Sequence, residues 1–230
     1  MPSGDKTPFP KTLSLAVHEF RTPVTVVGGY LRMVLREQAG PISEKQRKML
    51  DEAANSCGRI AALIEQMSEL GKMEAGSLPF AQQDVDLGLL LTEVASRMHQ
   101  GDDRGGRVEV RGPDQPAIMT GDRTRLSEAF ASLMHSALRE RGGLGPVVAE
   151  WSRVDEDGAP WAVVAIGDPS LLPSLAASRP VPPVFDEWIG GLGFALPLAR
   201  RMIEAHGGTV WSADGSQSRA ASAARLPLRV

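Results

Sequence analysis

The sequence contains a single cysteine, Cys57, so the chain cannot form an internal disulfide bond. It has no apolar run of the roughly 18 residues that a membrane-spanning helix needs. The N-terminal segment Met1–Lys11 is rich in proline and charge, and it lacks the apolar stretch of a secretory signal peptide. These absences predict a cytoplasmic protein with no membrane segment in this chain.

An excess of charge of one sign is also lacking. The 25 Lys and Arg residues nearly balance 28 Asp and Glu residues, which gives a net charge of -3 and argues against a nucleic-acid partner. No group of His, Cys, Asp or Glu residues has the spacing of metal ligands, so we expect no metal site of that kind. With 230 residues, 42% of them hydrophobic, the chain can bury the core of one large or two small domains.

Two amphipathic patterns predict a pair of consecutive helices. The break at Gly40-Pro41 ends the first helix, predicted over 12–39, and Ser43 with Gln46 predicts a capping box for the second. Two such helices cannot bury both apolar stripes alone, so we expect an antiparallel hairpin that dimerises into a four-helix bundle. The stripes alternate steps of four and three residues: Leu13, Val17, Phe20, Val24, Val27, Leu31 and Val34, then Met49, Ala53, Ser56, Ile60, Leu63, Met67 and Leu70.

The rest of the chain mixes helical and strand patterns. Helices are predicted at 87–98, 123–139 and 197–205, and strands at 107–111, 117–119, 147–151, 161–166, 209–211 and 223–228. A turn is predicted at 155–158. The fold class is therefore α + α/β, with the hairpin followed by an α/β sandwich that has its helices on one face. We divide the chain into a flexible tail at 1–11, the hairpin at 12–75, a linker at 76–83 and the α/β domain at 84–230.

Residues 18–23 read His-Glu-Phe-Arg-Thr-Pro, inside the first predicted helix. His18 and Thr22 lie one turn apart on the same face, beside the apolar seam, so the imidazole is expected to be accessible to solvent. A neutral imidazole nitrogen can attack a phosphoryl group, and a carboxylate that accepts the other ring proton fixes the tautomer. Glu19 has the right position for that role. The alternative interpretation is that His18 is an ordinary solvent-exposed histidine on the surface of the helix.

This hexapeptide resembles the H-box of the two-component sensor histidine kinases. Later segments resemble other motifs of that family, in the family's order: Leu70 to Gly76 the end of the second dimerisation helix, Val184 to Trp188 an F-box, Gly190 to Leu196 the second glycine box, and Ala199 to Gly208 the closing helix and turn. The resemblance implies a dimerisation and histidine-phosphotransfer hairpin followed by an ATPase-type domain. It also implies catalytic roles for His18, Glu19 and Thr22, with Phe20, Arg21 and Pro23 completing the H-box.

The resemblance implies a site for ATP and Mg²⁺ as well, but this sequence departs from the family there. Ser132 and Ser136 replace asparagines that hold magnesium and phosphates, and a serine would coordinate magnesium more weakly. Asp168 matches the adenine-reading aspartate, yet 169–173 has proline and leucine where glycines are expected.

The second glycine box is partly kept, as Gly191 and Gly193, but Ala195 replaces the next glycine and Ile189 alone remains of the segment that normally covers ATP. Two interpretations therefore stay open for each possible nucleotide-binding residue. Asp168 is either an adenine contact or a turn residue at the end of a strand. The two glycines either bind phosphate or form a structural turn. His206, in a His-Gly-Gly sequence, is expected to be a helix C-cap.

Three functions remain in competition. The first is phosphoryl exchange between His18 and response-regulator receiver domains, or their dephosphorylation, with a degenerate ATP site. The second is an ATP-dependent autokinase, and the third is a non-catalytic dimeric scaffold. The expected partners are a second copy of the chain, a receiver domain and an upstream histidine kinase. Receiver binding is expected to use exposed residues around His18, namely Val17, Thr22, Thr25 and Val26.

Overall fold

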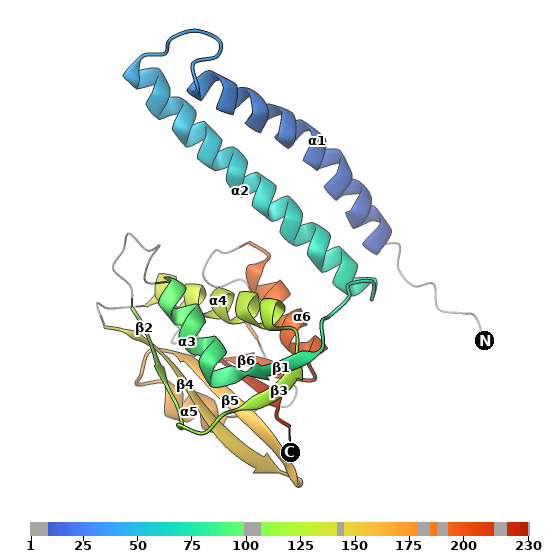
Figure 1. Ribbon diagram of the computed structural model, residues 1–230, viewed down its shortest axis with the longest axis vertical. Coiled ribbons are helices and arrows are strands. Elements are labelled where there is room, and N and C mark those ends of the chain that lie inside the picture. Colours follow the sequence, from blue (N-terminus) through green and yellow to red (C-terminus); the bar gives the residue numbers. More distant parts are fainter. Residues whose placement is uncertain are drawn as a thin grey trace, which may run out of the picture. The chain divides into compact units, whose positions relative to one another are not determined.

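The structure, a computed structural model, describes residues 9–98, 107–141, 145–178, 185–187, 193–213 and 220–229. The chain forms two compact units, Met1–Leu78 and Pro79–Val230. The first unit is a pair of long helices, and the second combines helices with a mixed sheet (Figure 1).

The hairpin consists of α1 (Phe9–Leu35) and α2 (Glu44–Glu74). Helix α1 begins three residues before the predicted start, and it ends at Leu35 rather than at Ala39. It ends early because Glu37 adopts a φ of 57°, a left-handed conformation that cannot continue a helix. The predicted capping box is confirmed: the Ser43 hydroxyl accepts from the Gln46 N–H, and the Gln46 side chain accepts from the Ser43 N–H at 2.8 Å.

Apolar contacts hold the two helices together only along part of the predicted stripes. Val17 and Ile64 are each 4% exposed and form the centre of the contact. The Cys57 thiol donates to the carbonyl oxygen of Val24 at 3.5 Å, so α2 approaches α1 closely just beyond the H-box. Other stripe residues remain exposed in the single hairpin: Phe20, Val27, Met49, Ile60 and Leu63.

Two adjacent glycines in α1 provide a matched test of this close approach. A Cβ on Gly29 would meet open space, whereas one on Gly28 would lie 3.3 Å from the Cys57 sulfur. Gly29→Ala is therefore expected to raise the hairpin's free energy of unfolding by about 1 kcal/mol, because alanine is the better helix former. Gly28→Ala should gain less, because the added methyl group presses on Cys57. Urea unfolding followed by circular dichroism measures both, and equal gains would contradict the packing role of Gly28.

The second unit is built on a five-stranded sheet in the order β2-β4-β5-β7-β6. Strands β2 and β4 are parallel, and the other neighbours are antiparallel. The strands are β2 (Val108–Arg111), β4 (Val147–Glu156), β5 (Ala159–Gly167), β6 (Thr209–Ser212) and β7 (Ser222–Pro227). A separate antiparallel pair joins β1 (Gln83–Asp86) to β3 (Ile118–Gly121).

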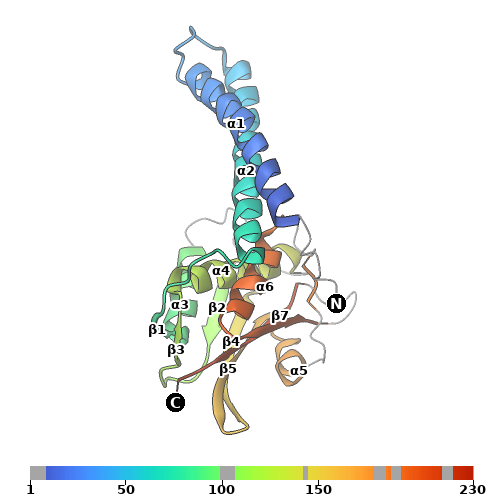
Figure 2. The same ribbon diagram turned by 90° about the vertical axis from the view of Figure 1, so that its right-hand side faces the viewer.

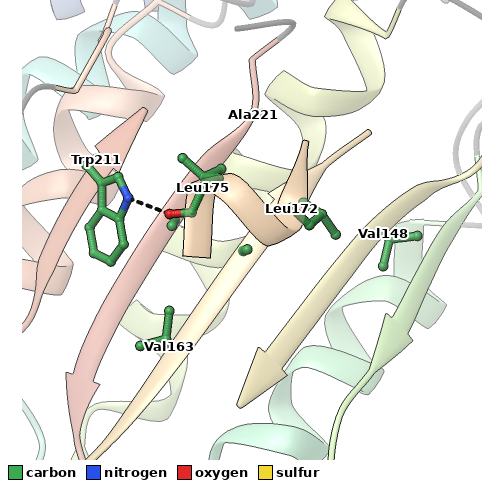
Figure 3. Close-up of a cluster of buried hydrophobic side chains, with 8 residues drawn as sticks. Val148, Val163, Leu172, Leu175, Trp211 and Ala221 are labelled. Atoms are coloured by element: carbon green, nitrogen blue, oxygen red, sulfur yellow. Dashed lines mark hydrogen bonds between the residues drawn. The ribbon is translucent and has the colours of Figure 1, made fainter. Parts of the chain in front are cut away.

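Three helices cover one face of the large sheet: α3 (Leu87–Met98), α4 (Arg123–Glu140) and α6 (Ala195–Ala205) (Figures 1 and 2). The prediction that all helices lie on one face is wrong, because the short α5 (Leu172–Ala177) packs on the other face (Figure 2). Leu172 and Leu175 are 2% and 3% exposed there. The indole N–H of Trp211 donates to the Leu175 carbonyl at 3.0 Å and fixes α5 above the cluster of Val148, Val163, Ala165, Ala221 and Ala223 (Figure 3).

Helix α6 ends at a buried histidine that connects three parts of the second unit. His206 is the C-cap residue of α6, as predicted. Its Nδ1 lies 2.6 Å from the Met202 carbonyl oxygen, to which it donates, so its Nε2 accepts the Asp122 N–H at 2.9 Å. Phe80 contacts the ring edge to face. A Cβ on Gly121 would lie 2.6 Å from the imidazole, so a glycine is required at this close approach.

The side chain of Asp122 caps α4 at its N-terminus and gives the fold a testable pH dependence. Burial opposes its ionisation, but hydrogen bonds from the backbone N–H groups of Ala81, Arg125 and Thr124 outweigh this effect and lower the pKa of Asp122. A lowered pKa means that the carboxylate stabilises the fold above the ordinary aspartate value of about 4 and loses this effect as the pH falls through the folded-state pKa.

Asp122→Ala is therefore expected to lower the free energy of unfolding by about 1 kcal/mol at pH 7, the usual effect of losing an N-cap. The difference from the wild type should shrink when the pH is taken below about 4. Urea unfolding at both pH values measures this, with the exposed Asp114→Ala as the control. A difference that does not change with pH would contradict the role of the ionised carboxylate.

Candidate functional site

The H-box residues lie in the middle of α1, on an exposed part of the hairpin. The side chain of His18 is 77% exposed, and its Nδ1 lies 3.3 Å from Oε1 of Glu19. When Nδ1–H donates a hydrogen bond to that carboxylate, Nε2 carries the lone pair on a side chain that is open to solvent. The arrangement therefore presents one imidazole nitrogen to an incoming group, as a nucleophile requires.

The other H-box residues divide between the hairpin contact and the surface. Thr22 is exposed one helical turn after His18, and Pro23 lies inside α1, where it removes one backbone donor. Phe20 is 55% exposed on a different side of the helix. Arg21 reaches across to α2 and pairs with Glu65 at 3.1 Å. Sequence reasoning missed Glu65, because only the antiparallel packing of α1 and α2 brings it to the H-box.

A second set of exposed apolar side chains lies on the same side of α1 as Thr22. Helical spacing of three, four and seven residues places them on one face, and Tyr30 is the most exposed of them at 65%. The set consists of Leu15, Val26, Tyr30 and Met33. The expectation that Val17 contributes to this surface is wrong, because Val17 is buried against α2.

The two serines that replace the family's asparagines lie one turn apart on α4. Ser132 donates its hydroxyl to the Glu128 carbonyl oxygen at 2.9 Å, a bond within its own helix. Ser136 is 2% exposed and borders a cavity of about 10 Å³, which has room for one water molecule. The other residues around this cavity are Leu133, Phe185, Asp186, Leu196, Ser212, Ala220, Ala221 and Ser222. The structure thus places Ser136 at a small cavity.

Asp168 follows directly after β5, and its carboxylate takes part in the turn that leads to α5. Its Oδ1 accepts the Ser170 N–H at 2.9 Å and the Ser170 hydroxyl at 2.6 Å. Asp168 and Ser132 are not among the residues around the Ser136 cavity. Gly193 has a φ of 62°, which suits a tight turn before α6. Gly191 and the predicted segment 188–192 lie outside the described residues.

The F-box-like residues are bound to α6 and β6. Arg200 on α6 pairs with both Glu187 and Glu204, and hydrogen bonds to Glu204 and Glu187 raise the pKa of Arg200. The backbone N–H of Asp186 donates to the Ser212 hydroxyl at 2.9 Å. These bonds hold Phe185 at the Ser136 cavity.

The described part of the chain contains neither a helix suited to a membrane nor a cluster of metal-ligating side chains. Among residues 9–98 and the other described ranges, no helix combines the length and apolarity of a membrane span. Within those same ranges, no three His, Cys, Asp or Glu side chains are grouped so that they could hold a metal ion.

The chain is similar to known proteins over most of its length. Residues 11–76 match the His Kinase A (phospho-acceptor) domain family, which covers the whole hairpin. The probable sensor histidine kinase TcrY of Mycobacterium tuberculosis is 25% identical over 224 residues, which are 93% of this chain and 44% of that protein. The phosphate regulon sensor protein PhoR of Pseudomonas aeruginosa is 27% identical over 197 residues, 82% of this chain and 43% of that protein. The hairpin belongs to the His Kinase A family, and the chain as a whole is similar to two-component sensor histidine kinases.

The similarity extends to the fold. The structure of this chain is similar to that of full-length ShkA, solved in complex with AMPPNP, with a TM-score of 0.71 and 20% identity over 96% of this chain and 46% of that chain. The predicted fold class, a helical hairpin followed by an ATPase-type α/β domain, is confirmed. The chain spans less than half the length of the relatives named here.

Proposed function

We propose that this chain carries a phosphoryl group on Nε2 of His18 and exchanges it with receiver domains of response regulators. The geometry of His18 carries the proposal: the side chain is 77% exposed, and the Glu19 carboxylate at 3.3 Å accepts a hydrogen bond from Nδ1–H. In the transfer, the Nε2 lone pair attacks the phosphorus of a receiver's aspartyl phosphate. The N–P bond forms, the P–O bond breaks and the aspartate carboxylate leaves. Glu19 stabilises the positive charge that develops on the imidazole.

We propose further that the nucleotide site is degenerate, so that His18 is supplied by an upstream histidine kinase or by a receiver. The described donors fit ATP and Mg²⁺ poorly. The Ser132 hydroxyl is bonded to its own helix, and Asp168 accepts two bonds from Ser170. The space beside Ser136 holds about one water molecule. No step of the proposed reaction uses a nucleotide or a metal ion.

A second reaction proposed for the same site is the dephosphorylation of a receiver domain by water. Thr22 is exposed one turn from His18, so its hydroxyl can orient a water molecule toward a phosphorylated aspartate held against this face of α1. The exposed side chains of Val26, Tyr30 and Met33 continue the same face and supply apolar contact area for such a receiver.

We also propose that the chain acts as a cytoplasmic homodimer. Phe20, Val27, Met49 and Ile60 are each about half exposed or more in the single hairpin. Pairing two hairpins in a four-helix bundle would bury these side chains. In this proposal the hairpin at 12–75 is the dimerisation and phosphotransfer domain, 76–83 is the linker and 84–230 is the nucleotide-site domain.

An active ATP-dependent autokinase is the second candidate. The specific observation in its favour is that ShkA, which shares this fold, was solved with AMPPNP bound. Asp168 also keeps the position of the family's adenine-reading residue, at the end of β5. A non-catalytic scaffold is disfavoured, because the pairing of His18 with Glu19 serves no purpose in a protein that only binds receivers.

The test uses purified protein and a panel of receiver domains phosphorylated with acetyl phosphate. The proposal predicts acid-labile, base-stable phosphate on His18 after mixing with at least one receiver, or faster loss of phosphate from that receiver. Thr22→Ala should slow the loss of phosphate and leave transfer to His18 intact. Receivers that keep their phosphate unchanged, with no label on the protein, would contradict both activities and favour the scaffold.

A further inference from the structure

The geometry points to a second role for Arg21: we propose that its guanidinium moves from Glu65 to the phosphoryl group when His18 is phosphorylated. This inference rests on the proposed phosphorylation of His18. Arg21 follows His18 by three residues on α1, and side chains at this spacing are neighbours with Cβ atoms about 5–6 Å apart. Both side chains are open to solvent, at 77% for His18 and 48% for Arg21.

In the unphosphorylated chain, Arg21 is held by a weak partner. It pairs with Glu65 through one guanidinium nitrogen at 3.1 Å, and the Glu65 side chain is 68% exposed. Exposed ion pairs of this kind contribute little to stability, because water and salt screen them. Exchanging Glu65 for a stronger anion therefore costs the hairpin little.

Phosphorylation of Nε2 creates such an anion next to Arg21. A phosphoryl group carries a charge of about -2 and three acceptor oxygens, and arginine binds such groups through two parallel hydrogen bonds. Glu19 cannot bind the phosphoryl oxygens, because its carboxylate is negatively charged and lies beside Nδ1. Arg21, three residues after His18, is a cation that helical spacing places next to His18 on the surface of α1.

The move has a second consequence on α2. Once Arg21 binds the phosphoryl group, Glu65 loses the pairing that the unphosphorylated structure shows. The Glu65 carboxylate on α2 is then paired with Arg21 in the unphosphorylated protein and separated from it in the phosphorylated protein. A partner that contacts both helices could therefore distinguish phosphorylated from unphosphorylated protein.

The test phosphorylates the full chain with phosphoramidate, which needs no nucleotide. The Nε2 lone pair attacks phosphorus, the P–N bond of phosphoramidate breaks and ammonia leaves. ³¹P NMR then follows the pH titration of the phosphoryl group on His18, with His18→Ala identifying the signal. A bound guanidinium favours the dianion, so removing it in Arg21→Gln should raise the titration midpoint by about half a pH unit or more.

Three further variants separate the proposed role from a structural one. Arg32→Gln removes an arginine charge that lies about 21 Å from His18 along the helix axis. This variant should leave the titration midpoint of the phosphoryl group unchanged. Glu65→Gln frees Arg21 from its ion pair. In this variant the titration midpoint of the phosphoryl group should equal the wild-type value or lie below it. Arg21→Lys should fall between wild type and Arg21→Gln, because lysine offers a point charge without the two-bond geometry.

Each outcome decides the matter. Equal midpoints for the wild type and Arg21→Gln would overturn the inference while leaving phosphorylation of His18 in place. An equal rise in Arg21→Gln and Glu65→Gln would also overturn it, since both variants break the ion pair and only its structural role would then matter. No phosphohistidine signal in the wild type would defeat the proposed function itself.

Discussion

Replacing His18 with glutamine is expected to abolish phosphoryl incorporation, both from phosphoramidate and from phosphorylated receiver domains. Glutamine keeps a polar side chain on the exposed face of α1, but it has no nitrogen lone pair that can attack phosphorus. The fold should be unaffected, because the His18 side chain is 77% exposed and its described contact is with the neighbouring Glu19. Acid-labile, base-stable phosphate on the purified protein is the quantity to measure.

The matched control is His135→Gln, which removes an exposed histidine of α4 in the second unit. This variant should incorporate phosphate as the wild type does. Phosphate that persists in His18→Gln and disappears in His135→Gln would identify His135, in the second unit, as the acceptor. Persistence in both variants would show that neither histidine is the acceptor.

Glu19→Gln is expected to slow phosphoryl transfer to His18 by about 100-fold or more, the usual range for a group that assists proton transfer. The carboxylate at 3.3 Å from Nδ1 fixes the ring tautomer and stabilises the imidazolium that forms during attack. A glutamine keeps the size of the side chain and removes the charge. Charge reversal in Glu19→Lys should abolish transfer, while size-exclusion chromatography still shows a dimer.

The control for Glu19 is Glu52→Gln, which neutralises an exposed carboxylate on α2 well away from the H-box. Its transfer rate should match the wild type. A Glu19→Gln variant with a normal rate would mean that the carboxylate has no part in the chemistry. A Glu19→Lys variant that no longer dimerises would assign the loss to assembly rather than to catalysis.

Strong local signals made much of the fold predictable from the sequence. Helix α3 has the predicted bounds, because its apolar residues keep a helical period and Asp86 accepts the N–H groups of its first turn. The Ser43–Gln46 capping box likewise depends on neighbouring residues alone. Where several levels of local preference agree, the element is specified without reference to the rest of the chain.

The elements that were missed depend on distant partners. Helix α5 has six residues, one of them Pro173 in its first turn, which is too short for a helical period to be visible. It is helical because the β5 and β7 face and Trp211 bury its two leucines. Strand β1 has only four residues and exists through its pairing with β3. The turn between β4 and β5 is shorter than predicted, Asp157-Gly158 alone, because pairing continues to Glu156 and Ala159.

The candidate site shows the same division. The contact between His18 and Glu19 joins adjacent residues, and the roles proposed for them rest on the hexapeptide. The Arg21–Glu65 pair required the hairpin's register, since 44 positions of chain separate its members, from 21 to 65. The turn bonds of Asp168 and the small cavity beside Ser136 required the tertiary structure, because neither can be read from residue types.

The most direct test of the account is incubation of the purified protein with Mg²⁺ and γ-labelled ATP, beside phosphoramidate as a donor that needs no nucleotide site. The account predicts label from phosphoramidate on wild type but not on His18→Ala, and none from ATP on either protein. Acid-labile label from ATP on the wild type alone would contradict the degenerate nucleotide site and make this protein an autokinase.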